Sequence, residues 1–240
     1  MRVALFITCI GDAVSPEVGR STVTVLERLG HEVVFPVEQT CCGQMHLNSG
    51  YRAEADALGE RFMRVFDGHD VIVSPSSSCV GTMRELHPEL HGRLYEFSEL
   101  LVKRLGVTDV GARFPHRVVY HPTCHSLRVT AVGDAPLALL RAVEGLELAE
   151  LGEARECCGF GGTFAIKNSD TSSAMVADKC AAIVASGASV VTALDSSCLL
   201  QIGGRLSREG AGVRAMHLAE ILAETGGAGT GTGAGAGGSA

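Results

Sequence analysis

The sequence has no excess of positive charge and no long hydrophobic run. Its 20 Lys and Arg residues stand against 27 Asp and Glu residues, which gives a formal net charge of −7. Because nucleic-acid-binding surfaces are normally rich in clustered Lys and Arg, this balance argues against a nucleic-acid partner. No uninterrupted apolar run approaches the roughly 18 residues that a membrane-spanning helix needs, so we predict no membrane span. With 46% hydrophobic and 20% charged residues, the composition is that of an ordinary globular protein.

The usual nucleotide-binding loops are also missing. The glycine-rich stretch GFGGTF at 159–164 lacks the GxxxxGK[ST] pattern of a phosphate-binding loop. It does not fit GxGxxG after a first strand either. Without a flavin or nicotinamide fingerprint, hydride chemistry on this chain would lack an evident acceptor.

Cysteine, in contrast, is abundant, with nine residues. The N-terminal stretch MRVALFITCIGDA has a short apolar run like that of a signal peptide, but it fits a buried first strand better. We therefore expect a cytoplasmic chain, in which a disulfide framework would not persist. Since nine is also an odd number, metal or redox chemistry is the leading explanation for the thiols.

Eight of the nine cysteines belong to an internal repeat. The repeated positions, at offsets of 115, 116 and 119, are Cys9 with Cys124, Cys41-Cys42-Gly43 with Cys157-Cys158-Gly159, and Cys79 with Cys198. The repeat predicts two halves, residues 1–115 and 116–224, followed by a disordered Gly/Ala-rich tail at 225–240. Cys180 has no counterpart, and we expect it to be a buried packing residue.

Each half alternates short apolar runs with longer amphipathic stretches. The expected strands are 3–8, 32–36, 70–75, 117–121, 146–151, 189–194 and 212–217, and the expected helices are 17–30, 51–68, 134–144, 170–186 and 218–224. This alternation predicts an α/β fold of two tandem, Rossmann-like βαβ halves with parallel strands. The repeated cysteines follow the strands, and loops at the carboxyl ends of parallel strands share one edge. Each half should therefore gather four thiols at one place.

Four convergent thiols can hold an iron–sulfur cluster or a tetrahedral zinc ion. The glycine after each vicinal pair permits the sharp turn that lets both sulfurs serve one centre. The spacing, Cys-x31-CCG-x35-Cys and Cys-x32-CCG-x38-Cys, is that of neither a zinc ribbon nor a bacterial ferredoxin, so it leaves both metals open. Four histidines lie near the thiols: His46, His121, His125 and His217. Each could ligate the metal, tune a cluster by hydrogen bonding or transfer a proton, or could only form a hydrogen bond with the loop backbone.

With these motifs in place, the chain resembles the cysteine-rich CCG-domain family, in particular its lactate-utilisation branch. The matching stretches extend over residues 1–224 and are MRVALFITCIGD, PEVGRSTVTVLERLGHEVVFPVEQTCCGQ, SSSCVGTM, HPTCHSLR, ECCGFGGTFAIK, and GGRL with HLAEIL. The resemblance implies an iron–sulfur subunit of a complex that oxidises L-lactate to pyruvate. It also implies partner subunits, one of them a ferredoxin-like iron–sulfur protein. L-lactate itself is a possible ligand of this chain.

The resemblance further implies one or two [4Fe-4S] clusters, held by Cys9, Cys41, Cys42, Cys79, Cys124, Cys157, Cys158 and Cys198. In its fullest form the family motif ends in Cys-x2-Cys and supplies five thiols to a noncubane cluster. Here Cys79 and Cys198 have no cysteine three residues later, which leaves four ligands per site, enough for a cubane. The alternatives are a two-site zinc protein with a structural or binding role, and a subunit of the glycolate or heterodisulfide type.

Overall fold

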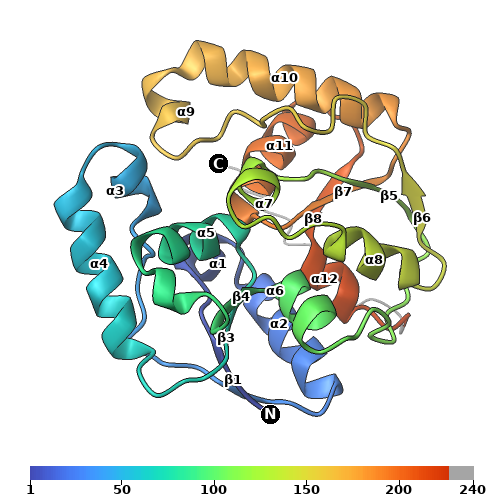
Figure 1. The fold of residues 1–240 in the computed structure, drawn as a ribbon. Coiled ribbons are helices and arrows are strands. Elements are labelled where there is room, and N and C mark those ends of the chain that lie inside the picture. Colours follow the sequence, from blue (N-terminus) through green and yellow to red (C-terminus); the bar gives the residue numbers. More distant parts are fainter. Residues whose placement is uncertain (227–240) are drawn as a thin grey trace, which may run out of the picture.

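The two predicted halves form two similar α/β units, shown in Figure 1. The computed structural model describes residues 1–226, so the predicted tail lies outside the described residues apart from its first two positions. The first sheet has the strand order β2-β1-β3-β4 and the second has β6-β5-β7-β8. All neighbouring strands are parallel, which confirms the predicted fold class.

The elements follow one another in the same rhythm in both halves. The first half contains β1 (Arg2–Leu5), α1 (Cys9–Val14), α2 (Pro16–Arg28), β2 (Glu32–Val34), α3 (Gln44–Asn48), α4 (Arg52–Val65), β3 (Ile72–Ser74), α5 (Ser77–Leu86), the 3-10 turn η1 (Pro88–Leu90), β4 (Leu94–Glu96), α6 (Phe97–Glu99) and the π-helical turn η2 (Leu100–Arg104). The second half contains β5 (Arg117–Tyr120), α7 (Cys124–Arg128), α8 (Ala135–Ala142), β6 (Glu147–Ala149), α9 (Phe164–Lys167), α10 (Ser169–Ala185), β7 (Val190–Ala193), α11 (Ser196–Arg208), β8 (Arg214–His217) and α12 (Leu218–Ala223).

The strand order places the cysteine loops at the switch point of each sheet. From β1 the chain moves outward to β2, then returns to the other side of β1 for β3. In such doubly wound sheets, ligands bind where the winding reverses, beyond the carboxyl ends of the strands. Cys9 begins the helix after β1, and Cys79 lies in the helix after β3. The second half repeats this arrangement with Cys124 and Cys198.

The two halves share one hydrophobic core. Helices α2, α6, α8 and α12 lie between the two sheets, whereas α4 and α5 cover the outside of the first sheet and α10 and α11 the outside of the second (Figure 1). Fully buried Leu26, Leu139 and Leu222 belong to the single inner cluster, although they come from different halves. We infer from this common core that the two halves form one folding unit and not two independently folded domains.

A long-range contact closes the inner layer at α12. The guanidinium of Arg28, at the end of α2, donates to the carbonyl oxygens of Leu222 (3.0 Å) and Ala223 (2.5 Å). It also donates to the carbonyl oxygen of Val110 at 3.1 Å. Since the last carbonyls of a helix have no partner within the helix, this cation satisfies the C-terminus of α12 from the other half.

Three features differ from the sequence-based expectation. Strand β4, with the sequence LYE, was not predicted. The helices that begin in the cysteine loops were also missed, and they include the ten-residue α5 and the 13-residue α11. Helix α2 begins at Pro16, one residue before the expected start, and the Ser15 side chain that precedes it makes no capping hydrogen bond.

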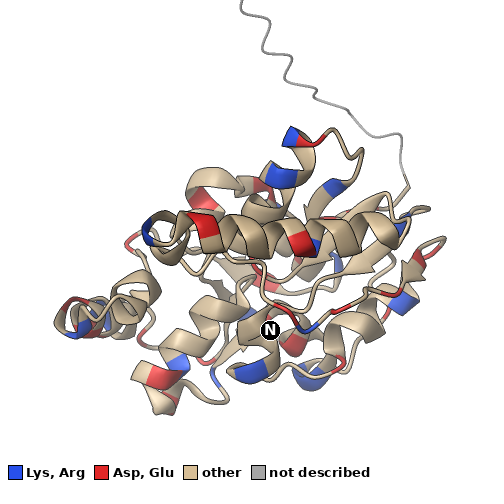
Figure 2. Cartoon of the chain, turned by 90° about the horizontal axis from the view of Figure 1, so that it is seen from above, with Lys and Arg blue, Asp and Glu red and all other residues tan. Residues whose placement is uncertain are grey.

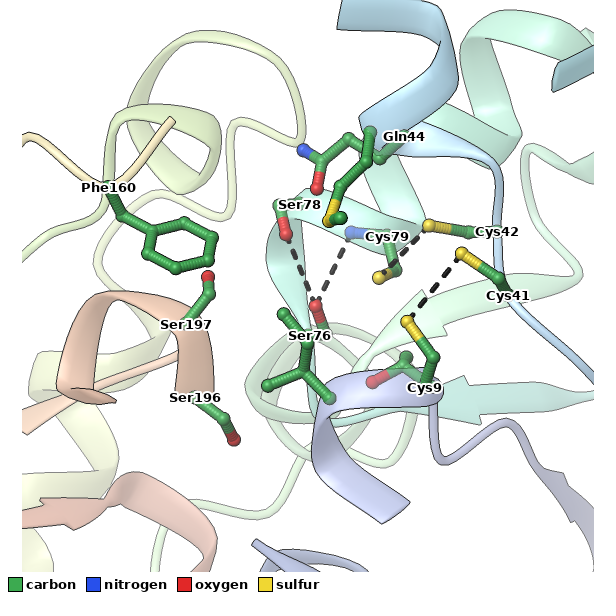
Figure 3. A pocket seen from close by; sticks show the side chains of 13 residues that line it. Cys9, Cys41, Cys42, Gln44, Ser76, Ser78, Cys79, Phe160, Ser196 and Ser197 are labelled. Carbon is green, nitrogen blue, oxygen red and sulfur yellow. Dashed lines mark hydrogen bonds between the residues drawn. The ribbon is translucent and has the colours of Figure 1, made fainter. Parts of the chain in front are cut away.

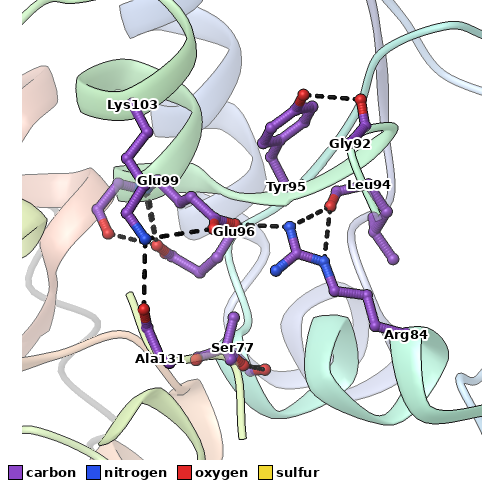
Figure 4. A network of polar contacts seen from close by, with 11 residues as sticks. Ser77, Arg84, Gly92, Leu94, Tyr95, Glu96, Glu99, Lys103 and Ala131 are labelled. Atoms are coloured by element: carbon purple, nitrogen blue, oxygen red, sulfur yellow. Dashed lines mark hydrogen bonds and ion pairs between the residues drawn. The ribbon is translucent and has the colours of Figure 1, made fainter. Parts of the chain in front are cut away.

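A buried polar network joins α5 to the inner layer (Figure 4). The Arg84 guanidinium lies 2.6 Å from the Glu99 carboxylate, and both side chains are almost fully buried. Lys103 extends the network, 3.4 Å from Glu99, and donates to the carbonyl of Ala131 in the second half. Removing one partner from a buried ion pair leaves an uncompensated charge, so Arg84 and Glu99 hold α5 against α6, and Lys103 adds an exposed contact to the second half.

Glu96, at the end of β4, gives the fold a predicted pH dependence. Burial raises the pKa of its carboxyl from 4.5 to about 8, although Ser98 and the backbone N–H of Glu99 donate to it. Because the folded pKa is raised, the stabilisation is complete below the unfolded pKa and is lost as the pH rises through about 8. A Glu96→Gln variant should therefore lose a component of about 1.4 kcal/mol per pH unit between roughly pH 5 and 8.

The measurement is urea unfolding of both proteins across that pH range. Buried histidines also titrate there, so the difference between the two curves isolates Glu96. Curves of equal slope would show that this carboxyl is already ionised at low pH.

Among the described residues, no helix combines the length and apolarity required to cross a membrane. On the face seen in Figure 2, basic and acidic segments alternate along the chain and do not gather by sign.

Candidate functional site

The first four cysteines line one cavity beyond the carboxyl edge of the first sheet (Figure 3). The Sγ atoms of Cys9 and Cys41 lie 3.5 Å apart, and those of Cys42 and Cys79 lie 3.2 Å apart. All four thiols are free. Cys9 is exposed, whereas Cys42 and Cys79 are buried, so the set extends from solvent into the protein.

Hydrogen bonds within this first set favour the ionised form of one thiol, that of Cys41. The pKa of Cys41 is lowered, first by the hydrogen bond from the Cys42 thiol and then by that from Cys9. The backbone N–H of Gly43 adds a third donor, 3.4 Å from the Cys41 sulfur. Sharing this charge raises the pKa of the Cys9 thiol. The lowered pKa of Cys41 favours its thiolate, the form in which cysteine binds metals.

The second set repeats this arrangement in the second half. Its four thiols are also free and line a second cavity: Cys124, Cys157, Cys158 and Cys198. The pKa of Cys157 is lowered by hydrogen bonds from the Cys124 and Cys158 thiols, and the N–H of Gly159 lies 3.4 Å from its sulfur. The structure therefore gathers both predicted groups of four, while their role as metal ligands stays a prediction.

The glycine after each vicinal pair is fixed by packing as well as by the turn. Gly43 and Gly159 both have positive φ, 81° and 83°, which favours glycine strongly. A Cβ on Gly159 would lie 2.7 Å from the carbonyl oxygen of Ser172, and one on Gly43 would lie 3.1 Å from the Cα of Ala55. Each glycine thus lets a cysteine loop press against the backbone of an outer helix, α10 or α4.

Gly159→Ala should destabilise the second half through this contact. Gly92 makes a matched control, because it has the same φ of 83° but no atom of the described residues lies within 4 Å of the place that a Cβ would take. We expect Gly92→Ala to cost about 1–2 kcal/mol for the left-handed backbone. Gly159→Ala should cost a further 1–3 kcal/mol or so, because α10 must move. Urea unfolding measures both, and equal losses would argue against the close packing on α10.

The two cavities share a wall between the two sets. Gln44, Ser78, Phe160 and Ser197 line both of them, and Figure 3 shows Phe160 and Ser197 facing the first-half cysteines. Across this wall, the side-chain nitrogen of Gln44 lies 3.0 Å from Nε2 of His125. None of the described residues that line either cavity is Lys or Arg.

Asp195 connects the two sets and was missed in the sequence. It is almost fully buried and accepts hydrogen bonds from the Ser76 hydroxyl (3.0 Å), the Ser78 backbone N–H (2.9 Å) and the Thr123 hydroxyl (2.6 Å). It precedes α11 but makes no side-chain cap there, and instead caps α5 of the other half. The internal repeat could have indicated this residue, because SSSC at 76–79 corresponds to DSSC at 195–198, with Asp195 in place of the first serine.

The four candidate histidines have different surroundings. His217 is structural, because its Nδ1 accepts the backbone N–H of Ala219 at 3.1 Å at the start of α12. His125 lies at the second set, with Nδ1 3.5 Å from the Cys124 sulfur. His46 is partly buried, and its Nδ1 has no partner among the described residues.

His121 is the most unusual of these histidines. It is 1% exposed, and neither ring nitrogen has a hydrogen-bond partner among the described residues. Burial lowers its pKa to about 4. Its donor atom and the sulfurs of Cys158 and Cys198 all lie within 4.8 Å of one another. Cys180 has different surroundings, because its fully buried thiol faces the carbonyl of Ile202 at 3.7 Å.

The donor atoms fit a resident metal group. Each half presents four free thiols with one favoured thiolate, and thiolates suit both iron–sulfur clusters and zinc. The unpartnered ring nitrogens of His121 also point to a missing partner in the second half, since buried polar groups are normally hydrogen-bonded.

Comparisons with known proteins agree with this geometry. The profile of the CCG family, described as a cysteine-rich domain, matches residues 3–84 and 118–203. The chain is 44% identical to Lactate utilization protein A of Oceanobacillus iheyensis, covering 92% of this chain and 96% of the relative. The protein of the same name from Geobacillus kaustophilus is 45% identical, with coverages of 92% and 98%.

Solved structures resemble the chain only distantly. A putative Asp/Glu racemase from Yersinia pestis aligns over 93% of this chain and 96% of its own, with 13% identity and a TM-score of 0.39, which supports no argument about function. The double family match coincides with the two cysteine loops and the two sheets, and the chain therefore belongs to the CCG cysteine-rich domain family.

Proposed function

We propose that the chain is an iron–sulfur subunit of an L-lactate-oxidising complex and passes electrons between partner subunits. The lactate chemistry is carried over from the relatives named Lactate utilization protein A. Each set of four cysteines would hold one [4Fe-4S] cluster, which supplies reversible one-electron transfer. The chain has only one cysteine outside these sets, so a ferredoxin-like partner is needed to carry electrons further.

The observation that best supports this proposal is that the cavities of the two thiol sets share a wall. Gln44, Ser78, Phe160 and Ser197 line both cavities, so groups held by the two sets would be neighbours within one rigid core. The exposed Cys9 and half-buried Cys124 place one edge of each set toward solvent. A partner could therefore exchange electrons at either set, and the wall would separate the two groups by a few side chains only.

The lining also favours electron transfer over lactate oxidation on this chain. A lactate carboxylate needs a cation or several N–H donors when it is taken from water. Among the described residues, those that line the two cavities include no Lys or Arg, and Asp195 lines the second cavity. The cations Arg155 and Lys179 line a separate hollow beside Cys157. Two thiolate sets add further negative charge. We therefore place the oxidation of lactate on a partner subunit.

A two-site zinc protein is the second candidate. It is favoured by the close convergence of His121, Cys158 and Cys198, whose donor atoms all lie within 4.8 Å of one another. A closed zinc site of this kind would be structural and redox-silent.

Anaerobic purification of the full chain tests the two functions against each other. We expect about four iron and four sulfide per occupied set, hence about eight of each per chain, and an EPR signal on reduction. Stoichiometric zinc without iron or sulfide would overturn the electron-transfer proposal. The thiols would then be structural, and all redox chemistry would belong to partner subunits.

A further inference from the structure

The two cysteine sets differ at one buried position. The backbone N–H of Phe6 donates to the carbonyl of Val73 at 2.8 Å, and that of His121 donates to the carbonyl of Thr192 at 2.8 Å. Both residues lie directly after the first strand of their half and three positions before its first cysteine. The repeat thus places an apolar ring at the first set and an imidazole at the second.

The environment of Phe6 accounts for an apolar residue there. Its ring packs edge-on against Phe62 and Phe66, with centroids 4.9 and 5.7 Å away. It fills the outer core between the first sheet and α4. This position therefore offers the first set no polar donor from its side chain.

The imidazole of His121 has the opposite environment. A neutral imidazole carries one N–H donor and one acceptor nitrogen, and neither finds a partner among the described residues. An unpaired buried polar group destabilises the fold, so its presence in the core calls for a compensating contact. The sulfurs of Cys158 and Cys198 converge on it within 4.8 Å.

We propose that His121 donates an N–H···S hydrogen bond to a thiolate of the second set when a cluster is bound, and so gives the second cluster a higher reduction potential than the first. This inference rests on the proposed function. A hydrogen bond to a ligand sulfur stabilises the more negative, reduced form of a cluster. Electrons that enter at the first cluster would then move to the second, because the second has the higher reduction potential.

At the first set, no histidine of the described residues converges with two cysteine sulfurs in this way, although Nδ1 of His46 also lacks a partner. His46 is its nearest candidate, but it is only partly buried, and it forms no such convergent group with two cysteine sulfurs. The second set also has a positively charged side chain nearby, that of Lys179. Lys179 is 2% exposed and lines the same hollow as Cys157. His121 therefore accounts for part of the difference between the sets, and Lys179 adds to it in the same direction.

The test is an EPR-monitored redox titration of the full chain, purified anaerobically, in four forms. Wild type should reduce in two waves. His121→Phe, which installs the residue of the first half, should lower the midpoint of the upper wave and leave the lower wave in place. A tenfold change in electron distribution corresponds to 59 mV for a one-electron couple, which the titration resolves. His121→Gln keeps an N–H donor and should restore most of the shift, and Cys180→Ala, buried but outside the set, should change neither wave.

The other outcomes overturn the proposal in distinguishable ways. A single wild-type wave, or unchanged midpoints in His121→Phe, would show that the histidine tunes nothing, with the electron-transfer function intact. Loss of half the iron in His121→Phe would make His121 a ligand instead of a hydrogen-bond donor. Zinc at the second set of the wild type would remove both this proposal and the proposed function of that half.

Discussion

Cys42→Ser is expected to remove the metal group of the first set and to leave that of the second. Cys42 is 2% exposed, and its sulfur lies 3.2 Å from that of Cys79, so water cannot easily reach its place in the set. Serine is a harder and far less acidic donor than cysteine, which makes it a poor substitute ligand. Iron and sulfide should fall by about half, from roughly eight to four per chain if both sets hold a cubane.

Cys158→Ser is the matched change in the second half, since Cys158 is equally buried at 2%. It should cause the same loss, with the first group retained. Cys180→Ala serves as the control, because its thiol faces the carbonyl of Ile202 and not the set. Simultaneous loss of both groups in either serine variant would mean that the sets are not independent, and a loss of iron in Cys180→Ala would mean that the ligand set is wrong.

Asp195→Ala should lower the free energy of unfolding by about 3 kcal/mol or more. The substitution leaves the Ser76 hydroxyl, the Ser78 N–H and the Thr123 hydroxyl without their acceptor in the buried interface between the halves. An unsatisfied buried donor costs about 1–3 kcal/mol, and water cannot easily reach all three. The effect should appear in anaerobic urea unfolding as a lower midpoint with an unchanged slope.

Two further variants serve as controls for Asp195→Ala. Asp195→Asn keeps one acceptor oxygen, and the Thr123 hydroxyl can rotate to accept from the new amide, so the loss should be smaller. Asp134→Ala removes an exposed carboxylate that pairs with exposed Arg141, and it should stay within about 0.5 kcal/mol of wild type. If Asp195→Ala were as stable as Asp134→Ala, the carboxylate would not be what holds the halves in register.

The sequence by itself determined the architecture and the membership of each thiol set. Alternating apolar runs and amphipathic stretches predicted seven of the eight strands and the helices α2, α4, α8, α10 and α12, because these patterns reflect burial on one face, but they did not predict α5 or α11. The duplication of Cys9, the CCG triplet and Cys79 then placed the thiols at strand ends, where parallel topology must bring them together. These features are local or periodic, and one sequence displays them directly.

Only the tertiary structure decided how the two halves meet and which side chains lie between them. The cap that Asp195 provides for α5, the contact of Gln44 with His125 and the burial of His121 depend on residues far apart in the chain. No local pattern reports such contacts, because each arises from packing two complete sheets around one inner helical layer. The repeat predicts that the sets are alike, and the packing around Phe6 and His121 makes them different.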